Sequence, residues 1–139
     1  MAEYLDQHYR KARVTTHVRL GWPPNVKGRD AAAVRERSFL VAVLLEADAI
    51  VRVGDRVRIL EFTVWRPTAK VAQLLRYKME LPGTPGYEDV DVDHVDLVLI
   101  TGLEDPGVRT FAEPYGIQVD VFSPRWLMEA LAKRRGSAT

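Results

Sequence analysis

The stretch that most constrains the fold is residues 95–101, VDLVLIT. It is a nearly uninterrupted apolar run, with Asp96 as its one charged residue. A strand that is apolar on both faces is typical of the middle of a sheet covered by helices above and below. The sequence therefore predicts a layered α/β domain with this strand near its centre.

The rest of the chain supplies the other elements of such a domain. Strand 13–20 alternates polar and apolar residues, and Gly54 and Asp55 join two apolar strands into a hairpin. The predicted helices and strands are, in order, helix 3–12, strand 13–20, helix 30–46, strands 48–53 and 56–65, helix 67–81, strand 95–101, helix 106–115, strand 117–122 and helix 124–135. The alternation of strands and helices after residue 66 predicts a mixed central β-sheet flanked by helices on both faces.

Two segments interrupt this regular order. Residues 21–28, GWPPNVKG, contain two prolines and two glycines and predict an arm rather than a helix or strand. We expect residues 1–28 to form an N-terminal segment with a strand and this arm, and residues 29–139 to form a single α/β domain. Residues 82–94 predict an acidic loop.

Composition excludes several classes of site. The 139 residues contain no cysteine, which excludes disulfides, thiolate metal sites and cysteine catalysis. The net charge of +1 argues against a protein that coats nucleic acid through bulk charge, although it leaves room for a local basic face. No apolar run approaches the roughly 18 residues that cross a bilayer. We expect a cytoplasmic protein, or a component of a virion or another assembly, without a membrane partner.

The informative strand for chemistry is 56–65, which carries Glu61 in its apolar middle. Leu60 and Phe62 are predicted to face a core, while Glu61 emerges on the other side. A carboxylate in such a place is costly unless it is paired or binds a metal. Asp48 opens the partner strand of the hairpin, so the turn brings it beside Glu61. Two carboxylates and a main-chain carbonyl form an all-oxygen site of the kind that Mg²⁺ prefers.

The string ADAIVRVGDRVRILEFTVWRPTAKVAQLLRYKMEL resembles the core of PD-(D/E)xK nucleases. In that superfamily an Asp opens one strand, a Glu-x-Lys lies on the next, and RecB-type members add Gln-x-x-x-Tyr on the following helix. Asp48, Glu61, Gln73 and Tyr77 match these positions. The resemblance implies a restriction-endonuclease-like core, a Mg²⁺- or Mn²⁺-dependent DNA nuclease, and Asp48 and Glu61 as metal ligands.

The chain departs from the family pattern in two ways. Thr63 stands where the family has its lysine, which is expected to orient water or stabilise charge on the phosphate. Lys70 on the next helix is a candidate replacement, as in some members of the superfamily. The predicted helix 30–46 also runs directly into Asp48 and leaves no room for the strand that usually intervenes. Strand 13–20 is a candidate for that place, and Glu36 is a candidate helix carboxylate.

Plainer interpretations stay open for the same residues. Asp48 and Glu61 can be hairpin carboxylates that pair with arginines; the candidates are Arg52, Arg56 and Arg58. Lys70 can be a solvated helix lysine. Gln73 and Tyr77 can be residues that border the core.

Two functional hypotheses follow. The first is a metal-dependent DNA nuclease. The second is a catalytically inactive structural or interaction module, for example of a phage particle, that has no cofactor and binds a protein partner or a second copy through the 21–28 arm and Trp22.

Overall fold

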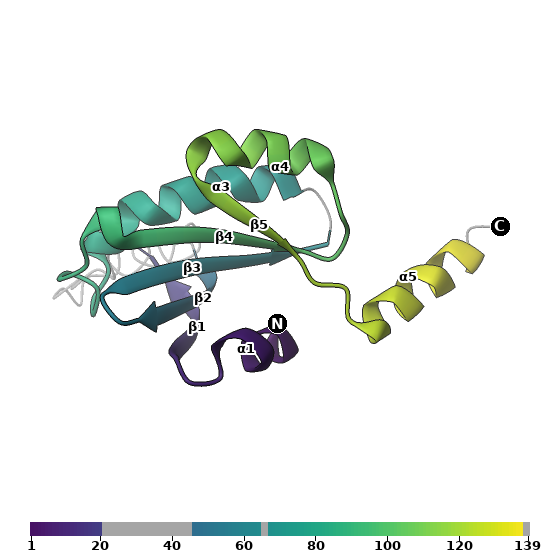
Figure 1. Ribbon diagram of the computed structural model, residues 1–139, viewed down its shortest axis with the longest axis horizontal. Coiled ribbons are helices and arrows are strands. Elements are labelled where there is room, and N and C mark those ends of the chain that lie inside the picture. The colour runs from purple at the N-terminus through teal and green to yellow at the C-terminus, as the bar shows by residue number, and fades with distance from the viewer. Residues whose placement is uncertain (21–45, 65–66, 138–139) are drawn as a thin grey trace, which may run out of the picture.

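The computed structural model describes residues 1–20, 46–64 and 67–137. Within them the chain forms one five-stranded sheet in the order β1-β2-β3-β4-β5 (Figure 1). The strands are β1 (Arg13–Arg19), β2 (Glu46–Val53), β3 (Arg56–Thr63), β4 (Val95–Thr101) and β5 (Ile117–Val121). The helices are α1 (Ala2–Tyr9), α3 (Pro67–Glu80), α4 (Pro106–Ala112) and α5 (Arg125–Ser137). The predicted mixed α/β sheet is confirmed.

The sheet changes direction at β3. Strands β1, β2 and β3 are antiparallel neighbours, whereas β3, β4 and β5 run parallel. The β2–β3 turn uses Gly54 in a left-handed conformation, with φ of 62°, which glycine adopts without steric cost. Strand β1 pairs with β2 at one edge of the sheet. Strand β4 lies inside the sheet, between β3 and β5, and is buried on both faces, as its sequence predicts.

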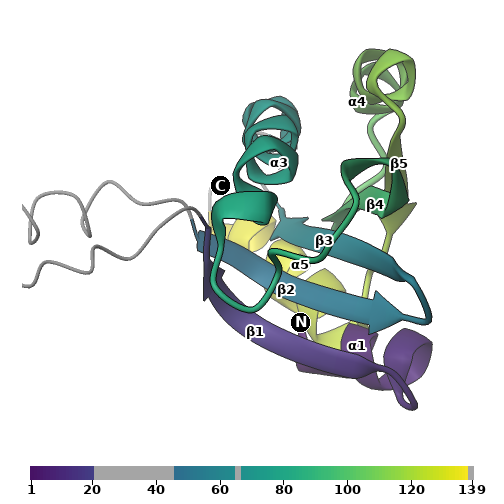
Figure 2. The ribbon, with the colours of Figure 1, turned by 90° about the vertical axis from the view of Figure 1, so that its left-hand side faces the viewer.

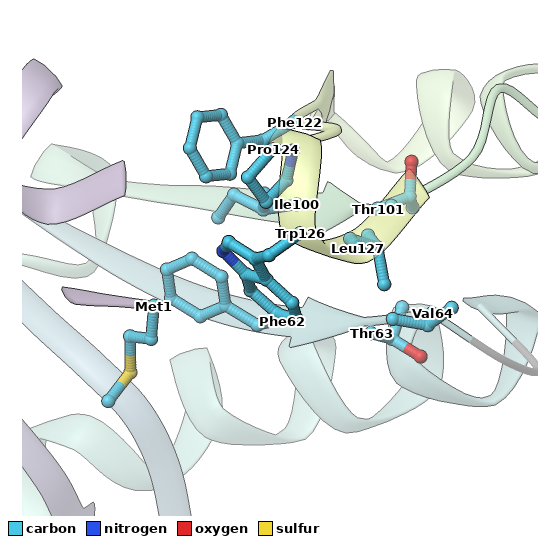
Figure 3. Close-up of a pocket in the computed structure, with 11 residues that line it drawn as sticks. Met1, Phe62, Thr63, Val64, Ile100, Thr101, Phe122, Pro124, Trp126 and Leu127 are labelled. Atoms are coloured by element: carbon cyan, nitrogen blue, oxygen red, sulfur yellow. The ribbon is translucent and has the colours of Figure 1, made fainter. Parts of the chain in front are cut away.

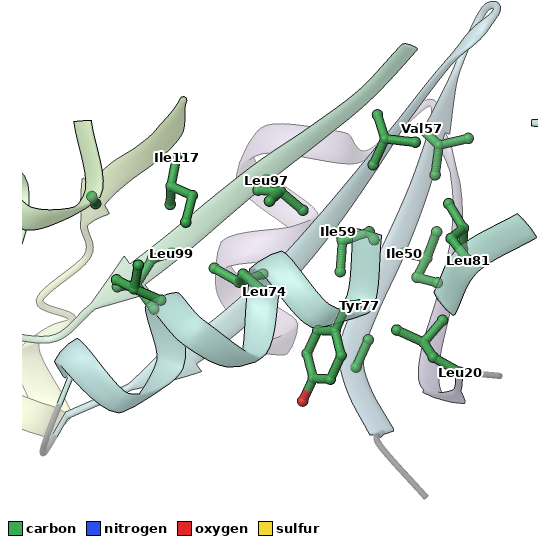
Figure 4. Packing of buried hydrophobic residues seen from close by; sticks show 14 of the residues in the cluster. Leu20, Ile50, Val57, Ile59, Leu74, Tyr77, Leu81, Leu97, Leu99 and Ile117 are labelled. Atoms are coloured by element: carbon green, nitrogen blue, oxygen red, sulfur yellow. The ribbon is translucent and has the colours of Figure 1, made fainter. Parts of the chain in front are cut away.

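Helices cover both faces of the sheet. Figure 2 shows α3 and α4 on one face and α1 on the other. The core on the α3 side surrounds Leu74 and Tyr77, and Figure 4 shows these side chains reaching the strands. The core on the α1 side surrounds Tyr4, against which Phe62 and Phe122 pack edge to face. Alternate residues of β3 and β4 therefore enter different cores: Ile59, Leu97 and Leu99 on the α3 side and Leu60, Val98 and Ile100 on the α1 side.

Several element boundaries differ from the sequence prediction. Helix α1 ends at Tyr9 rather than at residue 12. Strand β2 begins at Glu46 rather than at residue 48, because Glu46 continues the antiparallel pairing with β1 and does not end a helix. Strand β3 ends at Thr63 rather than at residue 65. The predicted helix 106–115 is α-helical only to Ala112 and finishes in a 3-10 turn, Glu113–Tyr115, before Gly116 with φ of 69° ends it.

Several predicted features lie outside the described residues. They are the 21–28 arm with Trp22, the helix predicted from residue 30 up to residue 45, the candidate carboxylate Glu36, and the domain boundary at residue 28. In the described ranges, no helix is both long enough and apolar enough to cross a membrane.

Candidate functional site

Asp48 and Glu61 face each other where the β2–β3 ladder ends. The last paired residues of this ladder are Ala49 and Leu60. At the next position, hydrogen bonds from backbone to side chain replace the ladder bonds. The Asp48 backbone N–H donates to Glu61 Oε1 at 3.1 Å, and the Phe62 N–H donates to Asp48 Oδ2 at 2.8 Å. Each carboxylate thus accepts a main-chain N–H of the opposite strand. The hairpin brings the two predicted carboxylates together.

Lys70 reaches the same place from α3. The helix begins at Pro67, so Lys70 lies in its first turn, directly after the connection from β3. Its Nζ atom is 3.2 Å from Glu61 Oε2. The Glu61 side chain is only 1% exposed and that of Lys70 is 33% exposed, so the ion pair is buried at the carboxylate and open to solvent at the ammonium. Lys70 is therefore not simply a solvated helix lysine.

Gln73 and Tyr77 lie on the inner face of the same helix. Tyr77 is buried, and its hydroxyl donates to the Glu46 carbonyl oxygen at 3.0 Å. Burial, followed by the nearby negative charge of Glu61, raises the pKa of Tyr77, so its hydroxyl stays protonated. The Oε1 atom of Gln73 is buried without a hydrogen-bond partner in the described part of the chain. Tyr77 thus supports the start of β2, while Gln73 leaves one amide oxygen unused.

The position of Glu61 favours a proton or a cation. Burial is the main cause that raises the pKa of this carboxyl, the Asp48 charge adds to it, and Lys70 acts in the opposite direction. Glu61 Oε2 has no hydrogen bond of good geometry and is faced by the Lys70 ammonium. Two carboxylates with an oxygen left over fit a hard cation such as Mg²⁺ or Mn²⁺. The described residues contain no group of three or more His, Asp or Glu side chains placed to hold a metal ion.

The three arginines of the hairpin bind elsewhere. Arg56 and Arg58 contact Asp96 on β4, at 2.7 and 3.7 Å, and Arg52 lies 3.8 Å from Asp89. The Arg56 guanidinium lowers the pKa of Asp96. These arginines therefore do not neutralise Asp48 and Glu61 in the structure.

Thr63, at the position of the family's lysine, is the last residue of β3 and borders an apolar pocket. Its carbonyl oxygen accepts the Gly102 N–H at 3.0 Å, and the pocket, of about 220 Å³, lies between β3, β4 and the start of α5. Figure 3 shows Trp126 and Leu127 of α5 closing this pocket. The ammonium beside Glu61 thus comes from the helix and not from the strand position that the motif specifies.

The sequence did not predict the backbone conformation of His17 or its contact with Glu46. His17 stands opposite Asp48 in the β1–β2 register, at a position where the ladder has no pair. Its backbone is left-handed, with φ of 54°, which is unusual for a residue other than glycine. The Nδ1 atom of His17 is 3.0 Å from Glu46 Oε1. The alternating pattern of strand 13–20 predicts only that this side chain is exposed, and gives no sign of the backbone departure.

Comparison with known proteins gives the fold and no family. No family model matches the chain, and no curated protein matches it. The crystal structure of a repair endonuclease from Pyrococcus abyssi matches with a TM-score of 0.55 and 16% identity, over 89% of this chain and 46% of that one. The crystal structure of a protein of unknown function, AF1548, matches with a TM-score of 0.52 and 13% identity, over 97% of this chain and 62% of that one.

The chain spans about half of the endonuclease and three fifths of the second protein. At these identities the likeness shows a shared fold. The α/β sheet therefore has a nuclease-like architecture, as the sequence predicts.

Proposed function

We propose that this chain is a metal-dependent phosphodiesterase of the PD-(D/E)xK type that acts on DNA. Asp48 and Glu61 hold Mg²⁺ or Mn²⁺, and Lys70 takes the place of the motif lysine. The observation that carries the proposal is the 3.2 Å contact between Lys70 Nζ and Glu61 Oε2, next to the two carboxylates that meet across the hairpin. The nuclease-like fold supports it.

Each residue has a role that its surroundings support. A bound divalent ion would activate water and neutralise charge that develops on the phosphate. The Lys70 ammonium, one third exposed, is placed to orient water or to stabilise that charge. Gln73 has a spare amide oxygen for a polar group that enters the site. Tyr77 is a positioning residue, because its hydroxyl fixes the main chain two residues before Asp48.

One observation favours the second candidate, a catalytically inactive nuclease-fold module of a larger assembly. Glu61 is 1% exposed, and the hydrogen bond that it accepts from Asp48 and its ion pair with Lys70 join β2, β3 and α3 through protein groups. A retired site would keep such contacts because breaking them leaves a buried charge. In that case the chain has no cofactor and works through a protein partner or a second copy, with the 21–28 arm as the proposed contact.

A thermal-shift measurement tests the metal site. Millimolar Mg²⁺ or Mn²⁺ should raise the melting temperature of the wild type, because a ligand that binds only the folded state stabilises it by about 2.7 kcal/mol at 100 times its Kd. Glu61→Ala should abolish the shift. Glu104→Ala is the control, since Glu104 is an exposed carboxylate paired with Arg109 on the surface. No shift in the wild type counts against the site and for the inactive module.

Cleavage of DNA tests the chemistry. If Lys70 acts as proposed, Lys70→Ala lowers the cleavage rate by about 10²-fold or more, the scale seen when one preorganised electrostatic group is removed. Glu61→Ala should abolish cleavage and Glu104→Ala should leave it unchanged. Strong wild-type cleavage that survives both Lys70→Ala and Glu61→Ala would refute the assignment of the site.

A further inference from the structure

A basic hollow lies at the hairpin end of the sheet, outside the carboxylate site. The connection between α1 and β1, residues 10–12, and the first residue of β1 have the sequence RKAR. With the β2–β3 hairpin they enclose a hollow of about 440 Å³. Four cations line it: Lys11 from the connection, Arg13 from the start of β1, and Arg52 and Arg58 from the hairpin.

The charges around this hollow are only partly neutralised. The carboxylates next to Arg52 and Arg58 are 3.8 and 3.7 Å away, longer than good hydrogen bonds. The Nε–H of Arg58 is buried without a hydrogen-bond partner in the described part of the chain. Lys11 and Arg13 are exposed, and neither forms an ion pair with another described residue. Clustered like charges repel one another, so an anion that enters the hollow is stabilised.

The hollow also has fixed geometry for planar recognition. Arg58 donates from Nη1 to the Tyr9 hydroxyl at 3.2 Å and lies 5.9 Å from the ring centroid. Arg52 lies over the Tyr87 ring, 4.8 Å from its centroid, and donates from Nη2 to the Gly86 carbonyl oxygen, so its guanidinium is turned towards the core on the α3 side. The Arg58 guanidinium is held on the side of the hollow and presents its remaining donors in a preset direction, which suits the oxygens of a phosphate group.

This hollow is not part of the carboxylate site. Arg58 precedes Glu61 by three residues on β3, which is about 10 Å along a strand. Its partner Tyr9 belongs to α1, which covers the sheet face opposite α3, the helix that carries Lys70 (Figure 2).

We propose that the hollow is a phosphate-binding site for the backbone of a nucleic acid strand, separate from the site of cleavage. The cations on two segments match a chain of regularly spaced phosphates better than a single anion. Binding here needs no metal and does not depend on the activity of Asp48 and Glu61. The proposal thus goes beyond the proposed function and stands for a nuclease and for an inactive module alike.

Oligonucleotide binding in EDTA tests this site without cleavage. The full chain is titrated into a labelled single-stranded DNA at several salt concentrations, and the double variant Lys11→Glu/Arg13→Glu is compared with it. Both positions are exposed, so the fold should be kept. A matched control with the same change of net charge is Arg76→Glu/Arg125→Glu, at exposed positions on α3 and α5.

The expected result is binding at least about tenfold weaker for the hollow variant, with a slope of log K against log salt smaller by about 1.4, since each neutralised phosphate on a single strand contributes about 0.7. The control variant should stay within about twofold of the wild type. Because the titration is done in EDTA, weaker binding of the hollow variant cannot come from loss of a metal at Asp48 and Glu61, which separates this site from the proposed metal site.

A second titration identifies the source of the phosphate. Inorganic triphosphate should compete for the hollow only weakly at constant ionic strength if a strand backbone is the ligand. Tight triphosphate binding that is lost in Lys11→Glu/Arg13→Glu, with DNA binding unchanged, overturns the nucleic acid as ligand. Equal loss of DNA binding in the hollow variant and the control, or no loss in either, overturns the site itself.

Discussion

Removing the Lys70 ammonium should destabilise the fold through Glu61. The two charges are 3.2 Å apart, and Glu61 is almost fully buried. Coulomb's law gives an upper limit of about 5 kcal/mol at an effective dielectric constant of about 20. Water screens the exposed third of Lys70, and Glu61 can take up a proton when its partner is lost. We therefore expect Lys70→Ala to lower the free energy of unfolding by about 1–3 kcal/mol at pH 8.

The stability that Lys70→Ala removes should increase as the pH rises. The pKa of Glu61 is raised in the folded state, so the folded chain keeps this proton to a higher pH than the unfolded chain. The contribution of Glu61 to stability therefore falls as pH rises from the ordinary carboxyl pKa to the folded one, and is constant above it. Without Lys70 the folded pKa rises further, so the fall continues to higher pH. Wild type and Lys70→Ala should have similar stabilities in acid and diverge as the pH rises.

Urea unfolding in EDTA at several pH values measures this difference. A double-mutant cycle with Glu61→Gln isolates the pair, because the glutamine is neutral and Lys70→Ala should then cost less than about 0.5 kcal/mol. If Lys70→Ala costs the same in both backgrounds, or the same at all pH values, the ion pair does not stabilise the fold and the reasoning is wrong.

Two further substitutions test neighbouring parts of the structure. Thr63→Lys should not raise DNA cleavage in an active enzyme, because Lys70 already supplies the ammonium; a cleavage assay that shows a gain in activity instead identifies a retired site. Gly102→Ala should cost about 1 kcal/mol or less in urea unfolding, because the new Cβ would lie 2.6 Å from Leu127 Cδ2, and this end of a flexible side chain can move into the pocket beside it. The control Gly83→Ala meets nothing within 4 Å, and an equal cost for it would refute the packing argument.

The fold was predictable where local patterns decide it. The apolar run 95–101 predicts β4 with its observed bounds, because only a strand covered on both faces is apolar throughout. The two-residue Gly54–Asp55 turn pairs Val53 with Arg56 and so fixes the register of the hairpin. Gly116 ends α4 and its 3-10 extension in the left-handed conformation that glycine adopts freely. These signals lie within a few residues of the structure that they specify.

The site was predictable only in part, because it depends on contacts between segments. The hairpin pattern places Asp48 beside Glu61. It does not show that α3 covers Glu61, which we expected to emerge from the sheet and which is buried instead. The 3.2 Å contact of Lys70 with Glu61 needs the path of the chain between β3 and α3, which no periodicity encodes. The left-handed backbone of His17 is equally invisible in an alternating strand.

The two proposed functions differ in what Lys70 does for Glu61. In the described structure the ammonium is the counter-charge of Glu61 Oε2, so the pair is balanced before any metal binds. A divalent ion held by Asp48 and Glu61 would have to share this oxygen with Lys70, and the exposed end of Lys70 would allow its ammonium to turn towards a phosphate. An inactive module has no such demand, and the same ion pair would then serve only to keep a buried carboxylate neutralised. Under these two proposals, the difference between a working site and a retired one would be whether the Lys70 ammonium can leave Glu61 Oε2, rather than whether the carboxylates are present.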